Sequence, residues 1–283
     1  GRSDTLIMLS ATPHDGKARS FASIMNMLDP TAIANPEDYG PEDIKGLYIR
    51  RFKKDIQHQV ETAFKEREIS VAHCDAGPDE ESVFDAFTHL RFQRLDQRRG
   101  PAPLFRITLE KALFSSPAAC LETIRNRIAR MEKAGNGRFQ TDIETLQTFA
   151  RAVAEIDAGR FSKYQKLLEI IRDDQTGVGW TPGKTTDRLV IFTERIETLH
   201  FLKDNLRRDL KLRENQLAIL HGGMSDIEQQ QVVEAFGKEE SPVRLMIASD
   251  VASEGINLHY LCHRMIHFDI PWSLMVFQQR NGR

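Results

Sequence analysis

The last five residues of the sequence contain two arginines that could bind an anion. Arg280 and Arg283 lie three residues apart in the stretch QRNGR. A guanidinium group presents a planar fork of donors that matches two oxygens of a phosphate or a carboxylate. Arginines three apart at the head of a helix lie on one face, so both could reach the same anion. A charged helix end left in solvent is the alternative, and these residues by themselves leave both interpretations open.

Other polar residues follow short apolar runs that could hold them beside such an anion. The runs are RLVIFT (188–193), QLAIL (216–220), VRLMIAS (243–249) and RMIHFD (264–269). Each is typical of a buried strand, and helical patterns lie between them. Strands that alternate with helices predict an α/β fold, with a parallel sheet covered by helices and ligands at the carboxyl ends of the strands. The residues at these ends are Thr193, His221 with Gly222 and Gly223, Ser249 with Asp250, and Asp269 with Pro271.

The middle of the sequence is helical and basic. Its apolar residues recur at helical spacing, first at Leu121, Ile124, Ile128 and Met131 and then at Ile143, Leu146, Phe149, Val153 and Ile156. Residues 89–138 hold eleven arginines and lysines against four acidic residues. The cations on the polar side of the first stripe are Arg125, Arg127, Arg130 and Lys133. A solvated helix face is the simpler interpretation, but this density of cations favours contact with the phosphates of nucleic acid.

Composition narrows the class of protein. A chain of 283 residues with 40% hydrophobic residues has enough apolar material for about two packed domains. Its three cysteines are far apart and odd in number, which argues against a disulfide framework and against a metal site built from cysteines. We recognise neither an apolar run of about 18 residues nor a signal peptide, so no membrane span is expected. These features predict a reduced, cytoplasmic protein.

Five motifs occur in a fixed order along the chain. They are SATP (10–13), GLYIRRFKKDI (46–56), LHGGMSDIEQQQVVEAF (220–236), ASDVASEGINL (248–258) and QRNGR (279–283). In this order they resemble the later motifs of superfamily-two helicases of the Swi/Snf type, which are ATP-driven DNA translocases. The stretch FSSPAACLETI (114–124) is similar to the helical insertion of bacterial members, such as RapA-like proteins and the helicase-like subunits of phage-restriction systems. The apolar run at residues 6–9 is expected to form the strand that precedes SATP.

The resemblance implies a role for each motif residue. Arg280 and Arg283 are expected to face ATP and act in catalysis, since an arginine supplied across a cleft stabilises charge on a transferred phosphoryl group. Gly255 and Asn257 are expected to bind ATP as well, near its ribose. The residues expected to couple the ATP site to nucleic acid are Ser10, Ala11 and Thr12. Those expected to contact the nucleic-acid backbone are Thr193, His221, Gly222 and Ser249.

The resemblance also implies a division into three parts. Residues 1–52 are expected to be a remnant of a first RecA-like lobe, residues 53–160 a basic helical insertion, and residues 161–283 a second RecA-like lobe. The family's phosphate-binding loop and its acidic magnesium motif are not found in this sequence, and its last motif is incomplete. This fragment alone is therefore expected to be inactive, with ATP and Mg²⁺ as cofactors of the full-length protein.

The expected function is that of the C-terminal part of an ATP-dependent translocase or helicase-like protein that moves along duplex DNA or remodels its complexes. Duplex DNA is the expected partner, and RNA polymerase or the subunits of a defence complex are further candidates. Two alternatives stay open. One is an ATPase that remodels RNA polymerase, and the other is a non-catalytic helicase-like module whose helical insertion binds a partner protein.

Overall fold

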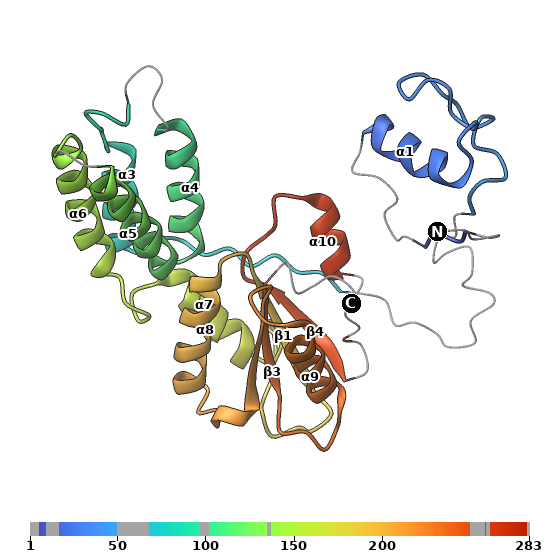
Figure 1. Cartoon of the computed structure of the whole chain (residues 1–283). Helices are drawn as coiled ribbons and strands as arrows, with labels where there is room; N and C mark the ends of the chain where they lie inside the picture. The colour runs from blue at the N-terminus through green and yellow to red at the C-terminus, as the bar shows by residue number, and fades with distance from the viewer. Residues whose placement is uncertain are drawn as a thin grey trace. The chain divides into compact units, whose positions relative to one another are not determined.

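The described chain falls into two compact units. The computed structural model describes residues 6–9, 17–49, 68–96, 102–134, 137–249, 258 and 261–281 (Figure 1). One unit comprises residues 1–71 and the other residues 72–283. The helical segment and the sheet described below both belong to the second unit. The finer division predicted at residues 52/53 and 160/161 stays a prediction.

A small core surrounds one helix in the first unit. This helix is α1 (Ala18–Leu28). The buried residues of the core are Ala22, Met25, Ile33 and Ile44. The side-chain amide of Asn26 both accepts from and donates to the main chain of Ile33, at 3.0 Å in each direction. Because both bonds reach seven residues along the chain, they fold the segment after α1 back onto the helix.

The strand expected at residues 6–9 is absent. These four apolar residues have no regular secondary structure, and Leu9 is 93% exposed. A strand must pair its backbone groups with a neighbouring strand. Within the described part of the first unit there is no strand that could act as this neighbour. The prediction made from the apolar run alone is therefore wrong.

The second unit contains a four-stranded parallel sheet. Its strands are β1 (Arg188–Thr193), β2 (Leu217–Leu220), β3 (Leu245–Ser249) and β4 (Cys262–His267). Their order in space is β2-β3-β1-β4, and all neighbouring pairs are parallel. Each strand lies within a few residues of the apolar run that predicted it. The predicted α/β fold with a parallel, helix-covered sheet is confirmed.

Helices bury both faces of this sheet. They are α7 (Ser162–Arg172), α8 (Ile196–Asp209) and α9 (Asp226–Gly237), while α10 (Leu274–Asn281) follows β4. Successive side chains of a strand point to opposite faces. Leu189 and Ile191 of β1 accordingly share a core with α7 and α8, whereas Val190 and Phe192 pack with Phe236 of α9. Figure 1 shows α8 and α9 on opposite sides of the strands. Burial on both faces explains why β1 and β3 are apolar along most of their length.

The described part of the basic middle of the sequence forms four helices. They are α3 (Pro78–Thr88), α4 (Ala102–Ser115), α5 (Pro117–Lys133) and α6 (Gln140–Ala154). We call residues 78–154 the helical segment. The predicted apolar stripe from Ile143 to Ile156 is buried throughout. One hydrophobic core runs from Val83 in α3 to Phe268 after β4, so the helical segment and the sheet are packed together. Among the described helices, none combines the length and the hydropathy needed to cross a membrane.

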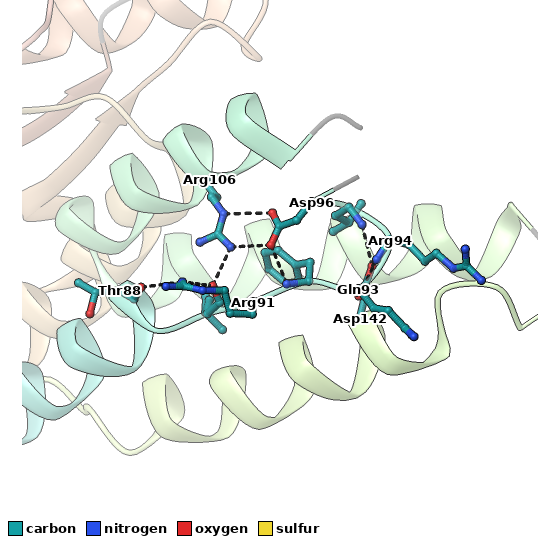
Figure 2. Close-up of polar contacts among 10 residues, drawn as sticks. Thr88, Arg91, Gln93, Arg94, Asp96, Arg106 and Asp142 are labelled. Carbon is teal, nitrogen blue, oxygen red and sulfur yellow. Dashed lines mark hydrogen bonds and ion pairs between the residues drawn. The ribbon is translucent and has the colours of Figure 1, made fainter. Parts of the chain in front are cut away.

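Two carboxylates order the chain between α3 and α4 (Figure 2). Asp142, in the first turn of α6, is buried and accepts hydrogen bonds from the main-chain N–H groups of residues 93–95, at 2.5, 3.0 and 3.0 Å. Asp96 forms an ion pair with Arg106 of α4 at 3.0 Å. A buried carboxylate is tolerated when such donors satisfy it. These contacts hold the loop against the helices on either side.

Candidate nucleotide and nucleic-acid interface

The four residues expected to contact nucleic acid from the strand ends lie at one edge of the sheet. Thr193 ends β1 and Ser249 ends β3, and these two residues are partners in the register of the strands. β2 ends at Leu220, directly before His221 and Gly222. Thr193 and Ser249 are buried, with exposed fractions of 0% and 4%, whereas Gly222 is exposed. The structure thus gathers these four residues, although only part of the set faces solvent.

Six further site residues lie outside the described residues. They are Ser10, Ala11, Thr12, Gly255, Asn257 and Arg283. Their expected roles in ATP binding, catalysis and coupling stay predictions.

One carboxylate at this edge, Asp269, accepts hydrogen bonds from several elements. Its Oδ2 accepts from Thr193 Oγ1 at 2.6 Å and from Ser115 Oγ at 2.7 Å. The main-chain N–H of Glu194 donates to the same oxygen at 3.1 Å. Its Oδ1 accepts from Lys163 Nζ at 2.7 Å. The side chain is buried, and donors from β1, α4 and α7 satisfy both of its oxygens.

A chain of hydroxyl groups leads from the start of α5 to Asp269. Thr198 Oγ1 lies 2.7 Å from Ser116 Oγ and 2.7 Å from Ser115 Oγ. Each hydroxyl has one proton to donate. Because Ser115 donates its proton to Asp269, Thr198 must donate to Ser115, and Ser116 must donate to Thr198. Ser116 also caps α5 by accepting from the N–H of Ala119 at 3.1 Å. Every hydroxyl in this network has a donor and an acceptor role, and connected hydrogen bonds strengthen one another.

The charge of Asp269 is set by opposing effects. Burial raises the pKa of its carboxyl group, but the ammonium of Lys163 and the hydrogen bonds from Lys163, Thr193 and Ser115 lower it. The lowering effects dominate, so the pKa lies below the ordinary value. The group is therefore a carboxylate at neutral pH, which agrees with its purely accepting hydrogen-bond pattern.

Arg280 lies inside this edge of the sheet and is completely buried. Its Nη1 donates to the main-chain carbonyl of Asp269 at 2.8 Å and lies 3.3 Å from His267 Nδ1. Its guanidinium carbon lies 5.2 Å from the centroid of the Phe192 ring. His267 Nε2 lies 3.1 Å from Asn281 Oδ1, so Nε2 donates and Nδ1 accepts from the arginine. In this structure Arg280 ties α10 to the end of β4, and its contact with ATP stays a prediction.

The low pKa of Asp269 predicts a dependence of stability on pH. A group whose pKa is lowered by folding stabilises the protein above its unfolded pKa of about 3.9. This contribution is lost as the pH falls through the lower, folded value. We expect Asp269→Asn to reduce the free energy of unfolding by about 2 kcal/mol near neutral pH and by progressively less below about pH 4. The charged side chains that donate to Asp269 are Lys163, which bonds its carboxylate, and Arg280, which bonds its main-chain carbonyl.

The measurement is denaturant unfolding of the wild type and the variant at a series of pH values from about 7 to about 3. Titration of all other carboxyl groups cancels in the difference between the two proteins. A difference that stays constant down to about pH 3 would contradict the expected contribution of Asp269.

The four cations predicted to bind phosphate on α5 have different surroundings. Arg125, Arg130 and Lys133 are exposed, although Arg125 also forms an ion pair with Glu122. Arg127 is partly buried, with its guanidinium carbon 4.9 Å from the centroid of the Phe105 ring. Burial, followed by the nearby charge of Arg130, lowers the pKa of Arg127. Three of the four side chains are therefore exposed to solvent, where a polyanion could contact them.

Asp269 lies at a predicted strand end, but the sequence indicates neither its role nor two of the side chains that donate to it. Those donors are Ser115 and Lys163, and Thr198 in turn donates to Ser115. The sequence does contain one signal, which is the pair of serines directly before the proline of the FSSP stretch. Two adjacent polar residues are unusual at the end of an apolar helix. One serine explains the helix cap. The second required a partner that the linear sequence does not identify.

The C-terminal part of the chain is similar to a known domain family. Residues 162–283 match the helicase conserved C-terminal domain. The matched range contains the sheet, α7 to α10, and the edge built around Asp269. This part of the chain is therefore similar to a helicase C-terminal domain.

Two curated relatives align with nearly the whole chain. The uncharacterised ATP-dependent helicase YqhH of Bacillus subtilis is 22% identical over 98% of this chain and 47% of its own length. The RNA polymerase-associated protein RapA of Vibrio parahaemolyticus is 21% identical over 100% of this chain and 30% of its own length. The chain thus spans less than half of either relative. Together with the domain match, they support the recognition made from the motifs, that of a helicase C-terminal region.

Two solved structures of ATPase domains are similar to part of this chain. The C-terminal part of the Fun30 ATPase domain is 14% identical, with a TM-score of 0.47, and the match covers 75% of this chain and 77% of that one. The SWI2/SNF2 ATPase core of Sulfolobus solfataricus, solved with double-stranded DNA, is 18% identical with a TM-score of 0.42. That match covers 92% of this chain and 50% of the Sulfolobus chain.

Proposed function

We propose that this chain is the C-terminal part of an ATP-dependent translocase that moves along duplex DNA or remodels complexes formed on it. The observation that carries the proposal is the helicase C-terminal domain in residues 162–283. The carboxyl edge of its parallel sheet is where ligands bind in this class of fold. The wide alignment with an ATP-dependent helicase, of which the chain covers 47%, supports a larger ATPase as the working enzyme.

Within this proposal the last motif serves the ATP site. Arg283 supplies a bidentate contact to a phosphate, and Arg280 holds α10 against the sheet through Asp269. Gly255 and Asn257 bind the nucleotide. When Mg²⁺ is bound with ATP in the whole protein, it neutralises phosphate charge. The residues proposed to couple hydrolysis to nucleic acid are Ser10, Ala11 and Thr12.

Duplex DNA is the partner that the surface chemistry favours. Arg125, Arg130 and Lys133 are exposed on α5, and exposed cations gain affinity from phosphates without reading sequence. His221, Gly222, Ser249 and Thr193 are the proposed backbone contacts at the strand ends, and Gly222 is exposed there. Thr193 is the weakest member of this set, because its hydroxyl already donates to Asp269.

A remodelling activity on RNA polymerase complexes is the second candidate. It is favoured by the alignment with a protein whose name states an association with RNA polymerase. A non-catalytic module is less favoured, because the helicase C-terminal domain is matched through its last arginine motif. Membership of a defence complex and a cytoplasmic location stay predictions.

A displacement assay separates these functions. We expect the whole protein that carries this chain to use ATP to displace a third strand from a DNA triplex while leaving the duplex paired. Separation of the duplex strands would assign a helicase instead. Hydrolysis of ATP without either displacement, together with release of RNA polymerase from DNA, would assign the second candidate. The absence of ATP hydrolysis in the whole protein would contradict the proposal.

A further inference from the structure

The junction between α4 and α5 reaches into the carboxyl edge of the sheet. α4 ends at Ser115 and α5 begins at Pro117, and both serines at this junction are buried, with exposed fractions of 4% and 0%. Their hydroxyls contact Thr198 of α8. Ser115 continues from there to the Asp269 carboxylate. The helical segment is thus hydrogen-bonded to the end of the sheet where ligands are proposed to bind.

A second contact joins the same two places. The ammonium of Lys163 donates to the carbonyl of Phe114, in the last turn of α4, at 2.9 Å. It also donates to Asp269 at 2.7 Å. The end of α4 is therefore linked to Asp269 twice, once through a hydroxyl and once through a cation. A movement of α4 would strain both links.

Asp269 connects these contacts to Arg280. Its carboxylate accepts from Ser115, while its main-chain carbonyl accepts from Arg280. Its main-chain N–H, together with that of Phe268, donates to the carbonyl of Phe192 at 3.3 and 2.8 Å. The residue is thereby fixed at the end of β1 by its backbone and is hydrogen-bonded to both α4 and α10. A shift of either helix changes the forces on the other through one residue.

We propose that Asp269 is a positioning residue through which the helical segment sets the position of Arg280 and of α10. The inference rests on the proposed function, in which Arg283, two residues beyond the end of α10 in the sequence, acts on ATP. A carboxylate suits this role because it accepts several donors at once. An amide in its place would present an NH₂ group to donors, so the contacts with Ser115, Thr193 and Lys163 could not all persist.

Two substitutions test this coupling in the whole protein. Asp269→Asn removes the carboxylate. Ser115→Ala removes the hydroxyl by which the helical segment donates to Asp269, without a large change in volume. We expect both to speed hydrogen–deuterium exchange of the α10 amides by at least about tenfold, because α10 opens more readily when its anchor is loosened. We also expect kcat for DNA-stimulated ATP hydrolysis to fall by at least about tenfold. The KM for ATP is expected to change by less than about twofold, because the proposal gives neither Asp269 nor Ser115 a contact with the nucleotide.

Asp142→Asn is the matched control. Asp142 is another buried aspartate of the second unit, and its carboxylate holds residues 93–95 rather than α10 (Figure 2). This change should speed exchange at residues 93–95 and leave both α10 and kcat unchanged. An effect on α10 as large as that of Ser115→Ala would overturn the proposal by showing that general loosening is sufficient.

The exchange measurement and the kinetics separate two kinds of failure. If the wild-type whole protein hydrolyses no ATP, the proposed function fails, while exchange of α10 still decides whether the helical segment and α10 are coupled. If ATP is hydrolysed but Ser115→Ala leaves α10 exchange unchanged, the coupling is overturned and the proposed function stands. If α10 exchange rises but kcat does not fall, the contacts hold the fold together without acting on hydrolysis, and the positioning role is overturned.

Discussion

Arg283→Lys is expected to lower DNA-stimulated ATP hydrolysis by the whole protein at least about tenfold, or by about 1.4 kcal/mol of transition-state stabilisation. Lysine keeps the positive charge but loses the bidentate fork that suits phosphate oxygens. Affinity for duplex DNA in the absence of nucleotide should stay unchanged, because the proposal assigns Arg283 to ATP. The measurements are steady-state hydrolysis at saturating DNA and equilibrium DNA binding without ATP.

Arg207→Lys, on the exposed surface of α8, is the matched control for this substitution. It makes the same chemical change in a side chain that has no proposed role, and both measurements should match the wild type. Full hydrolysis combined with weaker DNA binding in Arg283→Lys would place Arg283 on the nucleic acid and contradict the ATP assignment.

The second large effect is expected in DNA binding by α5. A variant in which Arg125, Arg130 and Lys133 are all alanine should lose three phosphate contacts, and each contact contributes about 0.9 to the slope of log affinity against log salt. The slope should therefore become less negative by about 2.7. Between about 50 and about 200 mM salt, the wild type should accordingly lose about forty-fold more affinity than the variant does.

Arg127→Ala provides the internal comparison for this experiment. Because its guanidinium packs on the ring of Phe105, we expect this change to lower the stability of the helical segment and to leave the salt slope nearly unchanged. If the triple variant has the same salt slope as the wild type, the three exposed cations do not contact phosphate and form only a solvated helix face.

The strands and helices of the second unit could be predicted because their signals are local. β1 coincides with the run RLVIFT, because its apolar residues 189–192 are buried on both faces of the sheet. The stripe in α6 was equally clear from its helical spacing. The run at residues 6–9 gave the same kind of signal and failed, because an apolar run becomes a strand only when a neighbour pairs with it.

The network around Asp269 could not be predicted by such means. Ser115, Thr198 and Asp269 are separated by more than 70 residues at each step, and nothing in the sequence says that their side chains meet. The burial of Arg280 has the same origin, because the rings and carbonyl that enclose it come from β1 and from the end of β4. Sequence motifs identified which residues belong to the edge of the sheet, whereas their division into exposed and buried groups depended on tertiary packing.

The most direct test of the central claim is ATP hydrolysis by the whole protein that carries this chain, measured over a range of duplex DNA concentrations. The account predicts a low rate without DNA and a saturable increase when DNA is added, because a translocase links hydrolysis to its track. A rate that does not respond to DNA, or no hydrolysis at all, would contradict the assignment of this chain to an ATP-driven DNA translocase.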